Sequence, residues 1–113
     1  MSFIRIDGPN FKSEQCVSKP VRDFARGQAC TLRLDGCDGG GETTVLAHIR
    51  RFGWAGISQK PHDFLAVHAC ASCHDLLDSR SASAPIGDDD ILRALGETLT
   101  RLYAAGLLHV GRK

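Results

Sequence analysis

Four cysteines in two pairs constrain this chain more than any other feature. Cys30 and Cys37 form a C-x6-C pair, and Cys70 and Cys73 form a C-x2-C pair. Two such pairs, separated by a β-rich stretch, are typical of a zinc ion held by four thiolates. A chain of 113 residues with one Trp and one Tyr builds a thin core, which a bound metal can stabilise. We therefore predict a structural zinc site, with Cys16 left over as a free thiol.

Other interpretations of the cysteines stay open at this level. A lone C-x2-C pair also occurs in thioredoxin-like redox proteins, although no βαβ pattern surrounds this one. Cysteines also occur in cores as buried apolar residues without a ligand. The spacing between Cys30 and Cys37 is longer than usual for zinc sites, and His74 would replace Cys37 if that thiol did not bind.

The composition places the protein in a reducing compartment. An odd number of cysteines fits a disulfide framework poorly, and the first residues lack the apolar core of a secretion signal. No apolar run is long enough to span a membrane. We expect a cytoplasmic protein whose thiols stay reduced. The net charge of +1 excludes few classes of partner. One stretch, however, contains three basic residues and no acidic residue, namely Arg50, Arg51 and Lys60.

The remaining patterns predict an α+β domain that follows an arm. Alternating and β-branched residues indicate strands, whereas residues such as Ser18, Pro20 and Gly27 mark helix ends. The predicted elements are a helix over 18–27, strands over 31–34, 43–50 and 64–69, and a helix over 70–79. We expect residues 1–19 to form a flexible N-terminal arm and residues 20–113 to form a single domain.

A longer helix is predicted near the C-terminus, over about 89–105. Asp88 to Asp90 supply an N-cap and first-turn acids that the helix dipole favours. Apolar residues then recur at helical spacing, namely Ile91, Leu95, Leu99, Leu102 and Tyr103. This stripe favours packing on the core, with a dimer face as the alternative.

The strand over 43–50 carries two chemically versatile side chains. Its alternation places His48 and Arg50 on one face. A zinc ion with four thiolates has no open position, so it holds structure and leaves His74 outside the clamp. If the strands pair as a hairpin and the helix over 70–79 packs across them, His48 faces His74 around a small cavity.

The order of these motifs resembles the HNH (ββα-metal) endonucleases. It is most similar to small phage- and prophage-type nucleases with an AHIR…KPxD…CxxCHD pattern. The matching segments are Ala47-His48-Ile49-Arg50, Lys60-Pro61-His62-Asp63 and Cys70-Ala71-Ser72-Cys73-His74-Asp75. The resemblance covers about residues 20–80, and the combined pattern is specific although each piece alone is weak. It implies a zinc-stabilised ββα-metal core over about 30–80, with the short N-terminal helix and the C-terminal helix beside it.

The resemblance also implies a metal-dependent DNA endonuclease. In that family the strand histidine, here His48, is the general base, and an imidazole can take a proton from water at neutral pH. The residue after the second cysteine, here His74, is a ligand of the catalytic divalent cation, expected to be Mg²⁺ or Mn²⁺. The expected reaction is hydrolysis of a phosphodiester that leaves a 5′-phosphate.

The chain departs from the family pattern at one position. Many relatives carry an acidic metal ligand just before the strand histidine, where this chain has Ala47. We expect Asp63 to serve with His74 as a ligand of the catalytic cation. Asp75 and His68 are the alternatives, and Asp75 also suits a role in capping the helix or orienting His74.

Three basic residues in and after the strand are expected to contact phosphate groups of DNA. Arg50 lies two residues from His48, and from this spacing we infer that its guanidinium can bind a phosphate oxygen. The alternative interpretation is a surface arginine without this role. Arg51 and Lys60 are expected to contact the DNA backbone, which implies weak sequence preference.

Two other functions remain open. Ala47 supports a zinc-stabilised DNA-binding or adaptor module without catalytic activity. The C-x2-C pair of Cys70 and Cys73 is also compatible with a dithiol redox function. Stoichiometric zinc would exclude this function, because the metal would occupy both thiols. We expect the protein to bind DNA and not to bind a membrane. A small nuclease that breaks both strands of a duplex needs two copies, so a homodimer is a further option.

Overall fold

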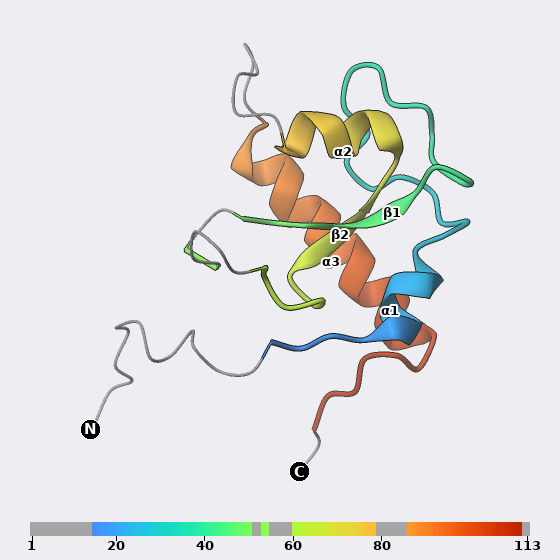
Figure 1. The fold of residues 1–113 in the computed structure, drawn as a ribbon, viewed down its shortest axis with the longest axis vertical. Coiled ribbons are helices and arrows are strands. Elements are labelled where there is room, and N and C mark those ends of the chain that lie inside the picture. The colour runs from blue at the N-terminus through green and yellow to red at the C-terminus, as the bar shows by residue number, and fades with distance from the viewer. Residues whose placement is uncertain (1–14, 51–52, 55–59, 79–85, 112–113) are drawn as a thin grey trace.

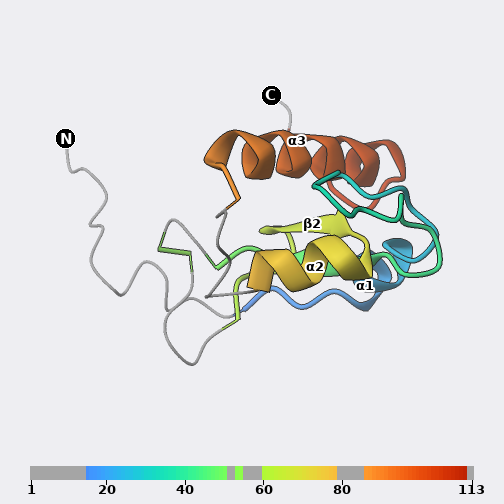
Figure 2. The same ribbon diagram turned by 90° about the horizontal axis from the view of Figure 1, so that it is seen from above.

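The structure, a computed structural model, describes residues 15–50, 53–54, 60–78 and 86–111. Its elements are helix α1 (Lys19–Phe24), strand β1 (Val45–His48), strand β2 (Ala66–Ala69), helix α2 (Ala71–Asp78) and helix α3 (Asp88–Ala104). The strands form an antiparallel hairpin. Helix α3 lies on one side of the hairpin, and α1 and α2 lie on the other (Figures 1 and 2). The α+β class predicted from the sequence is confirmed.

Helix α1 begins where its start signals predict and ends earlier than expected. The hydroxyl of Ser18 accepts a hydrogen bond from the N–H of Val21 at 3.3 Å, and proline occupies the first turn. Ahead of the helix, the side chain of Gln15 donates to the carbonyl of Pro61 at 3.2 Å. Residues 15–18 are therefore joined to the domain, while residues 1–14 of the predicted arm lie outside the described residues.

The strand predicted over residues 31–34 is wrong. These residues form a loop, in which Arg33 adopts a φ of 51° that a strand does not allow. The N–H and hydroxyl of Thr31 both donate to the carbonyl of His68, at 2.8 and 2.7 Å. The loop thus runs along the outer edge of β2, and it carries Cys30 and Cys37 toward the start of α2. We call residues 29–40 the cysteine loop.

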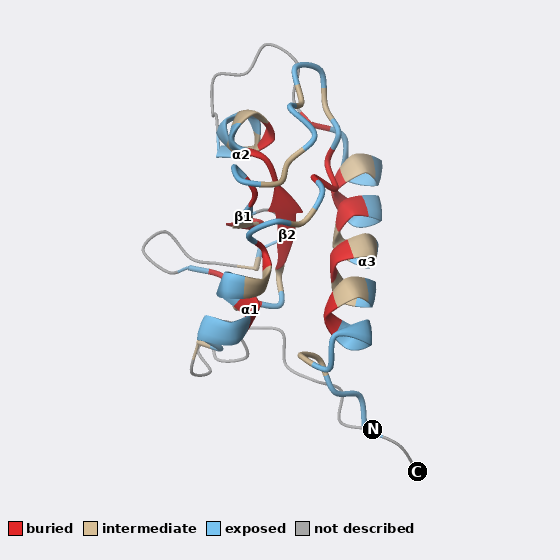
Figure 3. Ribbon diagram, turned by 90° about the vertical axis from the view of Figure 1, so that its right-hand side faces the viewer, coloured by how far each residue is buried: buried red, intermediate tan, exposed pale blue. Residues whose placement is uncertain are grey.

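The other two predicted strands are confirmed with shorter bounds. Ala47 pairs with Val67 and His48 pairs with Ala66 across the hairpin. Ala47 and Val67 are fully buried, and every residue of β2 is buried (Figure 3). The core is built from both strands, α2, α3 and the cysteine loop, with the following buried members: Cys30, Leu32, Ala47, Ile49, Val67, Ala69, Cys70, Cys73, Ile86, Ile91 and Ala94.

Helix α3 packs on β2, as its amphipathic pattern predicts, but its buried face is turned from the expected one. The buried residues are Ile91, Ala94, Thr98 and Leu102, and they face the hairpin in Figure 3. Tyr103, which the predicted stripe includes, is 58% exposed. Thr98 is a polar residue in this buried face. Its hydroxyl accepts a hydrogen bond from the N–H of His68 at 3.1 Å, so the buried group has a partner. The N-cap is Gly87, not an aspartate, although three aspartates do fill the first turn.

Two arginines of α3 fasten the cysteine loop to the domain. Arg93 donates to the carbonyl of Leu32 at 2.9 Å, and Arg101 donates to the carbonyl of Ala29 at 2.8 Å. These bonds satisfy loop carbonyls that no strand partner reaches. The helix therefore holds the position of Cys30. Within the described part of the chain, no helix has the length and apolar character that crossing a membrane requires.

Candidate functional site

The four paired cysteines meet at one point, where the cysteine loop reaches the start of α2. The sulfurs of Cys30, Cys37, Cys70 and Cys73 all lie within 4.8 Å of one another. Tetrahedral zinc with Zn–S bonds of about 2.3 Å separates its sulfurs by about 3.8 Å. The sulfurs of Cys37 and Cys70 are 3.8 Å apart. Among the described residues, this is the one group of three or more Cys, His, Asp or Glu side chains that could share an ion.

Backbone N–H groups point at the sulfurs of this four-cysteine cluster. The N–H of Gly39 lies 3.3 Å from the sulfur of Cys37, and the N–H of Cys73 lies 3.4 Å from that of Cys70. Such donors stabilise negative charge on sulfur, so they fit a cluster of thiolates around a cation.

The thiols of the cluster differ in how readily they ionise without a metal. Burial raises the pKa of Cys30, but the backbone N–H groups of Arg33, Cys70 and Leu32 outweigh burial and lower the pKa to about 7. Burial raises the pKa of the Cys73 thiol. A bound cation would take all four thiols as thiolates and release their protons. The donor set therefore fits zinc.

A second polar site lies at the end of β1, where His48 contacts a buried carboxylate. The Nε2 atom of His48 is 2.7 Å from Oδ1 of Asp63, whose side chain is 1% exposed. Arg22 of α1 donates to both carboxylate oxygens, from Nε to Oδ2 at 2.8 Å and from Nη2 to Oδ1 at 3.0 Å. The N–H of Ser18 donates to Oδ2 at 2.7 Å. The buried charge is thus fully paired.

These contacts set the protonation of Asp63 and the tautomer of His48. Burial raises the pKa of Asp63, but the hydrogen bonds from Arg22, Ser18 and His48 outweigh burial and lower the pKa. An ionised carboxylate only accepts hydrogen bonds, so Nε2 of His48 carries the proton that it donates. In a neutral imidazole, Nδ1 then holds the free lone pair. His48 is therefore oriented as a proton acceptor at Nδ1.

A hollow of about 360 Å³ opens beside His48, between α1 and β1. The side chain of His48 is 17% exposed. The hollow is lined by Arg22, Asp23, Arg26, Glu42, Thr44, Val45, Leu46 and His48. Arg22 and Arg26 are four residues apart, so they lie on one face of the chain as it leaves α1. We call this hollow the α1–β1 cavity.

His74 makes its described contact within its own helix. Its Nε2 atom lies 3.1 Å from Oδ2 of Asp78, one turn further along α2. None of the contacts described for the chain joins His74 to His48 or Asp63. Alternation along β1 points His48 away from the face of Ala47, which is fully buried in the core. The structure thus pairs Asp63 with His48. A joint role of Asp63 and His74 stays a prediction.

The remaining predicted residues are divided between exposed and buried positions. Arg50 and Lys60 are exposed, while Arg51 lies outside the described residues. His68, an alternative metal ligand in the sequence, is fully buried with its Nδ1 atom 3.2 Å from Arg101. It is thus out of reach of a solvent-facing cation.

Sequence reasoning missed the partners of Asp63. Arg22 and Ser18 precede it by 41 and 45 residues. In the sequence, Arg22 is one base among several on a short helix, and Ser18 acts here through its backbone. No local signal marks either residue, because their role depends on how the segment before α1 packs against residues 61–63.

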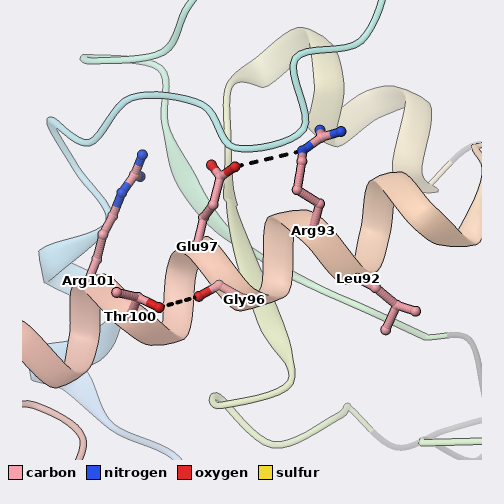
Figure 4. A pocket seen from close by; sticks show the side chains of 6 residues that line it. All are labelled: Leu92, Arg93, Gly96, Glu97, Thr100 and Arg101. Atoms are coloured by element: carbon pink, nitrogen blue, oxygen red, sulfur yellow. Dashed lines mark hydrogen bonds and ion pairs between the residues drawn. The ribbon is translucent and has the colours of Figure 1, made fainter.

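A separate hollow of about 390 Å³ lies along the outer face of α3 (Figure 4). Its polar groups are satisfied within the protein. Arg93 lies 3.7 Å from Glu97, and the hydroxyl of Thr100 donates to the carbonyl of Gly96 at 2.8 Å. No residue predicted as functional lines it, so the α1–β1 cavity is the stronger candidate.

The fold and site together define a class: a small α+β protein with a hairpin, a helix opening at a C-x2-C pair and a four-cysteine cluster. The chain belongs to the family described as "Putative nuclease YbcO", whose model matches residues 19–106. The putative nuclease YbcO of Escherichia coli (strain K12) is 48% identical over 62 residues, which are 54% of this chain and 65% of that protein. The putative nuclease ybcO of Enterobacteria phage 82 matches with the same values.

A solved structure is also similar. It is described as a putative bacteriophage protein from Escherichia coli K-12 MG1655, and it matches with a TM-score of 0.61 and 34% identity. The match covers 77% of this chain and 100% of the other. The chain spans 65% of the length of the two curated relatives. Relatives from a phage and a bacterium agree with the phage-type resemblance of the motifs.

Proposed function

We propose that the protein is a metal-dependent DNA endonuclease of HNH type, with His48 as the general base. The observation that carries this proposal is the hydrogen bond from Nε2 of His48 to buried Asp63, which leaves Nδ1 to accept a proton beside an open cavity. The family description names a nuclease, and DNA is the substrate that the motif pattern implies.

In the proposed reaction, Nδ1 of His48 takes a proton from a water molecule as its oxygen attacks phosphorus. The bond to the 3′-oxygen breaks, that oxygen takes up a proton, and the 5′-phosphate remains on the other fragment. Asp63 stabilises the imidazolium that forms, because a carboxylate 2.7 Å from Nε2 favours the charged ring. Arg50 would bind a phosphate oxygen, and Arg51 and Lys60 would contact the DNA backbone.

The four-cysteine cluster would hold zinc in this proposal. A zinc site made of four thiolates is closed, so the ion supplies folding energy and no chemistry. It would fix the cysteine loop to the start of α2. One zinc per chain in the purified protein supports this role, and it also excludes a redox function for Cys70 and Cys73.

The catalytic cation, Mg²⁺ or Mn²⁺, remains a separate part of the proposal. His74 is the ligand that the motif implies, and Asp78 is its neighbour at 3.1 Å. Asp63 is no longer included, because both of its oxygens are occupied by Arg22, Ser18 and His48. The described residues around His74 do not complete a group of three ligands. We therefore assign no step of the reaction to the cation.

The test is a cleavage assay on duplex, nicked, branched and single-stranded DNA with Mg²⁺, Mn²⁺ or EDTA. His48→Ala should lower the cleavage rate by about 10²- to 10⁴-fold, because it removes a general base. His109→Ala, at an exposed position beyond α3, is the matched control and should cut at the wild-type rate. If zinc-loaded, folded His48→Ala cuts as fast as wild type, the assignment is wrong.

A second candidate is a zinc-stabilised DNA-binding or adaptor module without activity. Ala47 favours it, since this fully buried residue stands where many relatives carry an acidic metal ligand. Salt-sensitive DNA binding with no cleavage under any divalent cation would support this function over the first. A homodimer is proposed only for the case in which the protein breaks both strands, and nicking of one strand would need a single copy.

A further inference from the structure

We propose that the α1–β1 cavity is a phosphate subsite for a DNA strand and that Arg26 is its principal cationic contact. This inference rests on the proposed function, because it assumes that the phosphate lies within reach of His48. It adds a binding site at the end of α1, because Arg26 follows that helix. The motif pattern does not include this segment. The sequence assigns phosphate contacts to Arg50, Arg51 and Lys60 instead.

Two arginines line the cavity, Arg22, which is paired with Asp63, and Arg26. Arg22 uses Nε and Nη2 on Asp63, which leaves Nη1 for another acceptor. Arg26 is exposed, and no described side chain forms a hydrogen bond or an ion pair with its guanidinium. A guanidinium free of carboxylate partners can bind two oxygens of one phosphate.

Two carboxylates, those of Asp23 and Glu42, line the same cavity. Asp23 is held by Lys19 at 2.6 Å, so a neighbouring base offsets its charge. Glu42 has no such base among the described residues, and it opposes the binding of an anion. The net attraction for phosphate thus depends on Arg26 and on the outer nitrogen of Arg22. Removal of the Glu42 charge should strengthen it.

His48 lies in the wall of the same cavity. The side chain is held by Asp63 from behind and is 17% exposed. A phosphate bound by Arg26 would lie in the same hollow of about 360 Å³ that the side chain of His48 lines. Contacts with phosphate oxygens alone carry no base information, so the subsite predicts binding with little sequence preference.

The binding test measures anisotropy of a labelled DNA duplex with zinc-loaded protein and no added divalent cation. Arg26→Gln should weaken binding about tenfold, the size expected for a lost charge-assisted contact. Glu42→Gln should tighten binding several-fold. Arg33→Gln is the matched control, because Arg33 pairs with Glu97 of α3 on the far side of the hairpin, and its affinity should stay within about twofold of wild type.

The site itself is mapped by adding inorganic phosphate and, separately, a short single-stranded DNA to ¹⁵N-labelled protein. Amide shifts should change at α1 and β1 in wild type and be lost in Arg26→Gln. Shifts confined to the neighbourhood of Arg50 and Lys60 would overturn the subsite. Shifts with phosphate but not with DNA would also overturn it as a DNA site.

The outcome separates this inference from the proposed function. If Arg26→Gln and Glu42→Gln bind and cut DNA like wild type while His48→Ala is inactive, the subsite is wrong and the nuclease assignment stands. If no variant or wild-type protein cuts DNA but Arg26→Gln still loses binding, the subsite stands and the nuclease assignment fails.

Discussion

Asp63 connects the proposed general base to the rest of the protein at the scale of single residues. Its oxygens accept four hydrogen bonds, from His48, from Arg22 twice and from Ser18. The carboxylate therefore selects the tautomer of His48 and also neutralises part of the positive charge of Arg22. In the proposed reaction, a single side chain thus affects proton transfer and the charge of the α1–β1 cavity.

Asp63→Asn tests this role, because asparagine keeps the shape and loses the charge. We expect cleavage to fall by about 10³- to 10⁴-fold, since an amide nitrogen facing the ring would favour the wrong tautomer. Stability should fall by about 1–3 kcal/mol, because Arg22 loses its charged partner and one of its two acceptor oxygens.

The readouts are single-turnover cleavage as a function of pH and thermal unfolding. A purely structural role would lower the melting temperature and leave the pH profile unchanged, which would contradict a positioning role. Asp35→Asn, at an exposed position of the cysteine loop, is the control and should match wild type in both.

At the scale of elements, the cysteine loop shows how backbone geometry builds the four-cysteine cluster. The loop is closed by an isolated bridge between Ala29 and Gly40, and the N–H of Cys30 donates to the carbonyl of Gly39 at 3.0 Å. Gly39 and Gly40 both have positive φ, 87° and 88°, which favours glycine. Only Gly40 has close neighbours. A Cβ there would lie 2.5 Å from the backbone nitrogen of Cys30.

Gly40→Ala and Gly39→Ala form a matched pair that isolates this close approach. Gly39→Ala should cost about 1–2 kcal/mol, the strain of a Cβ at positive φ, because no atom lies within 4 Å of the added carbon. Gly40→Ala should cost clearly more and should weaken zinc retention, because the backbone at Cys30 must move.

Chemical denaturation and zinc content after dialysis against a weak chelator measure these effects. Equal losses in the two variants would mean that the loop moves freely without disturbing the four-cysteine cluster. That result would contradict the link between the bridge and the metal site.

At the scale of the whole molecule, His68 joins elements from both sides of the hairpin. It stands on β2, its ring centroid lies 5.8 Å from that of Phe24 of α1, and its Nδ1 atom contacts Arg101 of α3. An arginine can only donate, so Nδ1 accepts and Nε2 carries the proton. Nε2 is buried and has no hydrogen-bond partner among the described residues. A neutral ring in the centre of the fold therefore has no means of stabilising a second proton.

Stability should consequently decline in mild acid. Burial, and then the charge of Arg101, lower the pKa of His68 to about 4. The unfolded chain has the ordinary histidine pKa of about 6.5, so between these values it binds a proton that the folded chain does not. The contribution is complete above pH 6.5 and is lost as the pH falls toward 4, by about 3 kcal/mol at most.

Urea unfolding at several pH values, for wild type and His68→Phe, checks this expectation. The phenylalanine variant removes the titrating group and should flatten the slope between pH 4 and 6.5. Asp63 and Glu97, whose pKa values are lowered in the folded protein, lose their stabilising effect only as the pH falls below about 4. An unchanged slope in His68→Phe would show that another group causes the acid sensitivity.

Much of the architecture follows from local sequence. Several features could be predicted because each depends on neighbours within a few residues: the Ser18 cap, the β-branched strand that contains His48, the helix start after Cys70 and the aspartates in the first turn of α3. The strand predicted at 31–34 failed for the opposite reason. The N–H of Thr31 bonds to β2, and the carbonyls of Thr31 and Leu32 accept hydrogen bonds from Arg93 of α3, so tertiary contacts replaced strand pairing.

The sequence by itself determined which residues are chemically equipped: two cysteine pairs, the histidines and the bases near the strand. Only the tertiary structure decided how they are grouped. It placed the four sulfurs together, paired Asp63 with His48, and brought Arg22 and Arg26 to the cavity beside β1. The physical reason is that hydrogen bonds and charge pairs act over a few ångströms in space, and segments 41 residues apart in the chain meet only after the hairpin and α1 have packed.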